Sequence, residues 1–258
     1  MKWTLSLGIA LISASLTSTV FASPITVTDT YIGSKQHSHG DVIGLDSQFD
    51  IQSATITQTG SQFTFDIATN FAQKSGQLFN AYTVGGTGIG YGDLFLTSEW
   101  TPFGSAPFTQ DDATTGTQWT YGLVLSDRYN NNGGTVSLFA LTGSNTQTAL
   151  MSDDLMQGNA QWRDGQEVIV DTASAQTQWL GDVGTWAVSN ALLSISADLS
   201  LSSLTSASTM AFHWGMTCAN DVIEGMIDLV MVPEPSTFAL LLVGLIGLGA
   251  VRRRMHQA

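Results

Sequence analysis

Hydrophobic and polar residues alternate with a period of two over much of this chain, which is typical of β-strands with one buried face. Residues 54–59 and 62–70 alternate cleanly on either side of Gly60-Ser61, which predicts a tight hairpin. Other runs of strand character cover residues 25–31, 92–100, 118–127, 135–141, 167–171, 184–188, 191–201 and 209–230. Residues 151–165 break this pattern, and we expect an irregular or briefly helical insertion there.

The composition between residues 23 and 232 supports an all-β fold. This stretch is rich in Thr, Ser, Gly, Asn and Gln and poor in Lys, Arg and Glu, a mixture that favours strands and turns. Its length of about 210 residues suits one domain. Cys218 is the single cysteine, so no disulfide can form within one molecule and stability must come from the core. We therefore expect a single β-sandwich domain of jelly-roll-like type over residues 23–232.

The first 22 residues have the pattern of a signal peptide. Lys2 precedes a mostly apolar run, and Val20-Phe21-Ala22 places small side chains at the positions that a signal peptidase reads. The composition changes sharply at Ser23-Pro24. We expect residues 1–22 to be removed by cleavage after Ala22.

The last segment of the chain, residues 233–258, holds a second apolar run between a Pro-Glu-Pro triplet and a basic end. The triplet is Pro233, Glu234 and Pro235, the apolar run covers residues 238–251, and the basic end is Arg252, Arg253 and Arg254. This run is shorter than the ~20 residues of a perpendicular membrane helix. Its glycines are nevertheless tolerated in membranes, and the arginines can snorkel to the interface and stay cytoplasmic. We expect a transmembrane helix.

This order of features resembles the PEP-CTERM sorting signal of Gram-negative bacteria, in which a membrane-embedded exosortase processes the tail and releases the protein outward. The resemblance implies secretion across the inner membrane, transient anchoring there through the C-terminal helix, and sorting to the cell surface or extracellular matrix. It names a signal peptidase and an exosortase-like enzyme as partners. We further expect a structural or adhesive role in association with exopolysaccharide, as in a biofilm.

Three stretches of the body are similar to blocks that recur in PEP-CTERM surface proteins. They are residues 41–44, 92–98 ahead of Trp100, and 213–225. Since that group has no established activity to transfer, the similarity implies a shared β fold and carries over no catalytic residue. We therefore do not expect an enzyme.

The charge of the body excludes nucleic acid as a partner. All of the chain's 21 acidic residues except Glu234 lie in residues 23–232, whereas only Lys35, Lys74, Arg128 and Arg163 are basic there. Nucleic-acid binding depends on Lys and Arg neutralising phosphates. The acidity instead favours solubility, and it can also collect divalent cations.

Two kinds of metal site can be written from these residues, although we assign neither metal nor cofactor. His213, Cys218 and Asp221 are candidates for a soft metal, but they lack the spacing of a zinc motif, which favours a structural role. Weak structural calcium sites would draw on aspartates in or near loops. These are Asp41, Asp46, Asp50, Asp111, Asp112, Asp153, Asp154 and Asp164. Solvated turn carboxylates are the alternative.

Carbohydrate binding is the most specific activity that the residues suggest. Trp162 and Trp179 lie among polar residues and are candidate sugar-stacking side chains, whereas Trp119 and Trp186 lie in alternating runs and are expected in the core. The alternative is an extracellular polysaccharide hydrolase, which needs two carboxylates across a cleft, for example Asp93 and Glu99. Assembly into a fibre through exposed strand edges is a third hypothesis.

Overall fold

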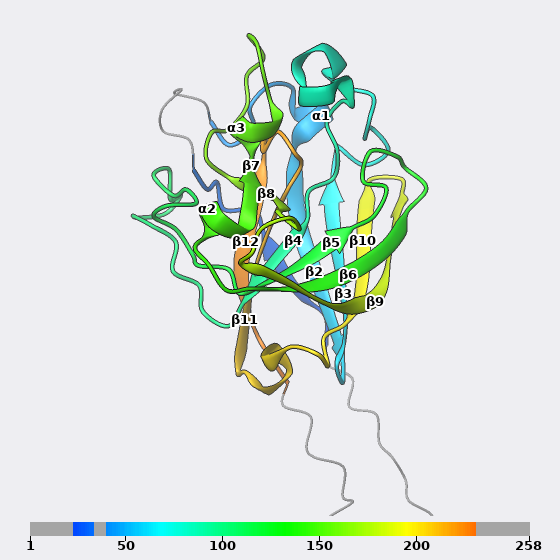
Figure 1. Cartoon of the computed structure of the whole chain (residues 1–258), viewed down its shortest axis with the longest axis vertical. Coiled ribbons are helices and arrows are strands. Elements are labelled where there is room, and N and C mark those ends of the chain that lie inside the picture. The colour runs from blue at the N-terminus through cyan, green and yellow to red at the C-terminus, as the bar shows by residue number, and fades with distance from the viewer. Residues whose placement is uncertain (1–22, 34–39, 231–258) are drawn as a thin grey trace, which may run out of the picture. The chain divides into compact units, whose positions relative to one another are not determined.

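The computed structural model describes residues 23–33 and 40–230, and strands form most of its regular structure (Figure 1). The predicted signal peptide, residues 1–22, and the predicted sorting segment, residues 233–258, lie outside these residues. Among the helices of the described part, none is long and apolar enough to cross a membrane.

The strands found in the described residues range from three residues in β7 to thirteen in β9. They are β1 (Ile25–Thr28), β2 (Ile51–Thr59), β3 (Gln62–Thr69), β4 (Leu94–Thr97), β5 (Tyr121–Leu125), β6 (Gly134–Leu141), β7 (Ala149–Met151), β8 (Glu167–Val170), β9 (Thr177–Ser189), β10 (Leu192–Asp198), β11 (Thr209–Gly215) and β12 (Val222–Asp228). Single-turn helices lie between them: α1 (Asp46–Phe49), α2 (Asn145–Thr148), α3 (Ser152–Leu155), and the 3-10 turns η2 (Asn80–Tyr82), η3 (Val84–Gly86) and η4 (Ser203–Ser206). The all-β prediction is confirmed.

Ten of these strands form one sheet in the order β1-β2-β3-β10-β9-β6-β5-β4-β11-β12, and β7 pairs with β8 in a separate ribbon. Neighbouring strands are antiparallel. The predicted hairpin is β2–β3, and Gly60 in its turn has a φ of +64°, a conformation that glycine adopts without strain. The register Ile56↔Phe65 puts two buried side chains opposite each other on the inner face.

The ten-stranded sheet curls until its first and last strands approach each other. β12 packs against β1 and β2, and a Cβ built on Gly225 in β12 would lie 2.6 Å from Cγ1 of Val27 in β1. The ladder does not continue between β1 and β12, so the sheet is a near-barrel with an open seam there. The predicted two-layer sandwich is not confirmed, because all ten strands are hydrogen-bonded into one sheet. Period-two patterning marks buried faces, but it cannot say which strands pair.

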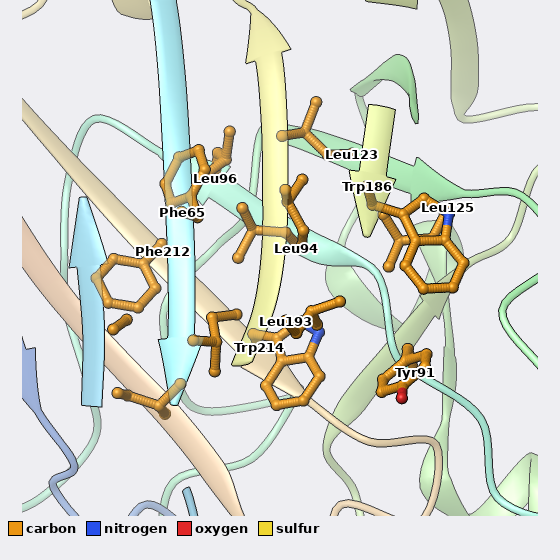
Figure 2. Packing of buried hydrophobic residues seen from close by; sticks show 14 of the residues in the cluster. Phe65, Tyr91, Leu94, Leu96, Leu123, Leu125, Trp186, Leu193, Phe212 and Trp214 are labelled. Atoms are coloured by element: carbon orange, nitrogen blue, oxygen red, sulfur yellow. The ribbon is translucent and has the colours of Figure 1, made fainter. Parts of the chain in front are cut away.

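The interior of the curled sheet holds the main hydrophobic core. Figure 2 shows part of it, with Phe65, Tyr91, Leu94, Leu96, Leu123, Leu125, Trp186, Leu193, Phe212 and Trp214. These side chains come from β3, β4, β5, β9, β10 and β11 and from the segment before β4, so the core joins strands far apart in the sequence.

A second apolar layer lies on the outer face of β4, β5 and β11, beneath the β7–β8 ribbon. Phe95, Trp119 and Val170 belong to it. Gly122 in β5 allows this contact, because a Cβ there would collide with Cγ2 of Val170 in β8. Trp119 and Trp186 are both buried, as predicted, although only Trp186 lies in the main core.

Candidate functional site

Three aspartates far apart in the sequence meet near the seam of the sheet. Asp29 follows β1, Asp41 lies in the loop before α1, and Asp221 immediately precedes β12. One carboxylate oxygen from each lies within 4.8 Å of the others. Asp41 is exposed and Asp221 is buried, so the cluster reaches from solvent into the domain.

Backbone groups fix two of these carboxylates. The Asp221 carboxylate accepts the Ile51 N–H at 2.6 Å and the Val222 N–H at 2.9 Å, which joins the starts of β2 and β12. Asp29 accepts the N–H of Thr30 at 2.6 Å. The cluster therefore forms because β1, β2 and β12 come together at this end of the seam.

The guanidinium of Arg163 is the cation of this cluster. It is fully buried, and it donates to the carbonyl oxygens of Ala219 at 3.0 Å and of Ile32 and Gly33 at 2.9 Å each. It also donates to the Asp41 carbonyl, and its Cζ atom lies 5.2 Å from the centre of the Tyr31 ring. One side chain thus organises the loop before residue 34, the loop at residue 41 and the turn before β12.

Burial makes two acids of this cluster, Asp29 and Asp221, hold their protons to higher pH. Burial, together with the charge of Asp41 and a hydrogen bond to it, raises the pKa of Asp29 to about 7. Burial and the charge of Asp29 raise the pKa of Asp221 to about 9, although the Ile51 N–H and Arg163 oppose the shift. Near neutral pH, protons on Asp221 and partly on Asp29 therefore reduce the negative charge of the cluster, and the positive charge of Arg163 offsets part of the rest.

The arrangement provides oxygen donors of the kind that calcium prefers. Of the aspartates predicted as calcium ligands, only Asp41 belongs to this cluster, together with Asp221 from the predicted soft-metal set. Several others hold local structure: Asp112 accepts from the Thr114 and Thr115 N–H groups, Asp153 from Gly165, and Asp154 from Met151. Asp29 and Arg163 were not among the predicted site residues. Asp29 sits on the same face as Ile25 and Val27, and a carboxylate on that apolar face was the available signal.

The predicted soft-metal set is not assembled. His213 contacts Phe95 and Trp119 of the second apolar layer, and both of its ring nitrogens are occupied: Nδ1 lies 2.8 Å from Oε1 of Glu224 and Nε2 lies 2.7 Å from the Glu167 carbonyl oxygen. Burial raises the pKa of the Cys218 thiol to about 12, so it stays protonated and makes a poor metal ligand. The side chains of His213 and Cys218 are both fully buried in the β domain.

The two carboxylates suggested for a hydrolase have different surroundings. Asp93 is buried, and its oxygens contact the Arg128 guanidinium at 2.7 Å and the N–H groups of Leu125 and Val170 at 2.9 Å each. Glu99 instead lines a small open cavity of about 240 Å³. The residues around that cavity are Thr97, Ser98, Glu99, Thr101, Gln118 and Thr120, so Glu99 is the only carboxylate among them.

The two tryptophans proposed for sugar stacking differ in exposure. Trp179 in β9 is 58% exposed and stands opposite Phe139 of β6. Trp162 is half-buried, donates its indole N–H to Asp153 at 2.8 Å, and packs against the main core. Trp179 is therefore the better placed of the two to meet a ligand.

The chain carries a PEP-CTERM protein-sorting motif, whose family model matches residues 232–254. The predicted sorting signal is thereby confirmed, and the motif implies processing by an exosortase, export, and sorting to the cell surface. No curated protein and no solved structure matches the chain. The motif begins four residues after the end of β12 at Asp228, so it directly follows the β domain.

Proposed function

We propose that this protein is an exosortase-sorted component of the cell surface or extracellular matrix, with a structural or adhesive role in association with exopolysaccharide. The observation that supports it best is the PEP-CTERM motif at residues 232–254. A signal peptidase removes residues 1–22, the C-terminal apolar segment holds the protein in the inner membrane, and the exosortase then releases the β domain.

The β domain suits this role for two reasons. Its ten strands and two apolar layers give a large core without a disulfide, so it does not depend on the redox state outside the cell. Its exposed Trp179 offers a flat apolar face, which is how proteins commonly contact sugar rings. Carbohydrate binding is the adhesive activity that follows from this surface.

Processing tests the proposal directly. A chain with an epitope tag between residues 22 and 23 is produced in a Gram-negative host with an exosortase and in the same host lacking it. We expect a shorter, released protein only in the first host. Replacing Pro233, Glu234 and Pro235 by Ala together should leave the full-length chain in the inner membrane, whereas identical processing of both chains in both hosts would refute the proposal.

The mature domain, residues 23–230, then separates adhesion from hydrolysis. It is incubated with exopolysaccharide purified from the same host, and bound protein and new reducing ends are both measured. Co-sedimentation without new reducing ends supports the adhesive role. New reducing ends that disappear in Glu99→Gln would instead support the polysaccharide hydrolase.

A further inference from the structure

The side chain of Gln58 holds the last residue that the structure describes at the C-terminal end of the domain. Its Oε1 accepts the Val230 N–H at 3.0 Å, and its Nε2 donates to the Val230 carbonyl oxygen at 3.2 Å. Nε2 also donates to the Gly60 carbonyl at 3.3 Å in the β2–β3 turn. Gln58 is only 7% exposed, so these hydrogen bonds are largely shielded from water.

The Gln58 side chain stands on the buried face of β2, the face that also carries Ala54 and Ile56. By bonding both backbone groups of Val230, it ties the segment that follows β12 to the end of β2. The contact therefore fixes the chain where it leaves the β domain.

The chain between Val230 and the sorting motif is short. The matched motif begins at residue 232, and only four residue steps separate Val230 from Glu234. An extended chain spans at most ~3.6 Å per residue, so the connection from the residue that Gln58 holds to Glu234 is at most ~14 Å long. A processing enzyme bound to the membrane must therefore work against the folded domain, or the contact must open.

We propose that Gln58 is a positioning residue for sorting: its amide forms a latch on Val230 that must open before the motif is fully accessible to the processing enzyme. The latch consists of the Gln58 side chain and the backbone of Val230. This inference rests on the proposed function, because it concerns the rate of the same processing step. Opening the latch frees Val230 to lengthen the connection between the β domain and the motif, whereas Leu229 stays held by its N–H bond to the Ser208 carbonyl at 2.8 Å and by its place in the main core.

The test compares processing rates in the host that contains the exosortase, by pulse-labelling the tagged full-length chain. Gln58→Met keeps the size of the side chain but loses both hydrogen bonds to Val230. Gln178→Met is the matched control, because Gln178 is exposed on β9. Each chain is also made with a six-residue Gly/Ser insertion between Val230 and Met231, which lengthens the connection without touching the latch.

We expect Gln58→Met to be processed at least threefold faster than the unchanged chain, and Gln178→Met to be processed at the unchanged rate. The insertion alone should also accelerate processing, and Gln58→Met should add no more than a small further increase to it. A Gln58→Met rate equal to or below the unchanged rate, at an equal melting temperature of the purified domain, overturns the latch.

Two further outcomes keep the test decisive. If Gln58→Met does not fold, the chain with the Gly/Ser insertion alone is compared with the unchanged chain. An equal processing rate of these two chains also overturns the latch. If no chain is processed, including the unchanged one, the proposed function itself fails rather than the latch.

Discussion

His213 is held between two oxygen acceptors, with Nδ1 2.8 Å from Oε1 of Glu224 and Nε2 2.7 Å from the carbonyl oxygen of Glu167. A neutral imidazole has one N–H, so satisfying both acceptors requires the protonated ring. The indole N–H of Trp100 bonds the other Glu224 oxygen at 2.9 Å, which leaves Glu224 well suited to carry the negative charge. A buried imidazolium–carboxylate pair therefore joins β11 and β12 to the β7–β8 ribbon.

We expect the domain to lose stability as the pH rises above about 6.5. Burial lowers the pKa of His213, but the hydrogen bond and charge of Glu224 outweigh burial and raise it overall. A raised histidine pKa contributes stability that is complete below the unfolded value of ~6.5 and is lost as the pH passes the folded pKa. Burial raises the pKa of both Asp111 and Glu167 to about 7. Between pH ~4 and pH 7 these acids hold protons in the folded state that the unfolded chain has lost, so they too make stability fall as the pH rises.

Thermal melting of the purified domain between pH 5 and pH 9 measures this loss. His213→Gln should lower the stability at pH 5 by ~3–5 kcal/mol, because Glu224 then loses its buried partner. Above pH 6.5 its stability should change less with pH than that of the unchanged domain. Parallel curves for the two proteins would show that His213 is not the titrating group.

The pH also controls any cation bound by Asp29, Asp41 and Asp221. A divalent cation competes with the protons that Asp29 and Asp221 hold up to pH values near 7 and 9. With a calcium dissociation constant of ~0.1–1 mM, 10 mM calcium adds about 1.4–2.7 kcal/mol. We expect a rise in Tm of roughly 3–10 °C at pH 8.5 and a smaller rise at pH 5.5.

Two exposed aspartates give the matched comparison for calcium. Asp41→Asn removes one ligand of the cluster and should abolish the shift at pH 8.5. Asp228→Asn, at the end of β12 and outside the cluster, should preserve it. Equal melting temperatures with calcium and with a chelator at both pH values would reject a calcium site in this cluster.

Local features of the fold could be predicted from the sequence because they depend on neighbouring residues. The β2–β3 hairpin follows from Gly60 between two alternating runs, and the burial of Trp186 follows from its place in such a run. β9 was predicted only from residue 184, but it begins at Thr177. Its first half pairs with β6 through two register shifts, so the alternation that marks a regular strand is absent there.

Neither the order of the strands nor the candidate site could be predicted, because both depend on contacts between residues far apart in the sequence. Asp29 and Asp221 meet only because the sheet curls until β1 and β12 approach, and no local pattern encodes that curvature. A buried arginine is rare in general, so Arg163 in a polar loop gave no sign of its burial. The sorting motif, by contrast, is a continuous stretch and could be recognised directly.

Removing Arg128 should strongly destabilise the domain. Its guanidinium contacts the fully buried Asp93 carboxylate at 2.7 Å, and Asp93 in turn accepts the Val170 N–H from the β7–β8 ribbon. Arg128→Met leaves that carboxylate without its cation, which costs ~3–5 kcal/mol. Lys74→Met, which loses a hydrogen bond to a carbonyl oxygen at a half-buried site, should cost about 1 kcal/mol in the same urea titration. Equal losses would contradict a special role for the buried pair.

The two candidate tryptophans should separate binding from stability. Trp179→Ala removes an exposed side chain, so we expect a stability change within ~0.5 kcal/mol and a clear loss of exopolysaccharide co-sedimentation. Trp162→Ala removes a half-buried ring and its bond to Asp153, so it should cost ~1–3 kcal/mol and leave binding intact where the domain is folded. Unchanged co-sedimentation of Trp179→Ala would exclude this surface as the binding site.

The seam between β1 and β12 should be sensitive to one added methyl group. A Cβ on Gly225 would lie 2.6 Å from Cγ1 of Val27, closer than real contacts allow, and valine cannot move aside easily. We expect Gly225→Ala to cost ~1–3 kcal/mol by urea unfolding. Gly40→Ala is the control, since nothing lies within 4 Å of a Cβ there. In the double variant, Val27→Ala should recover part of the loss, whereas strictly additive effects of Gly225→Ala and Val27→Ala would show that the seam is not closed by this contact.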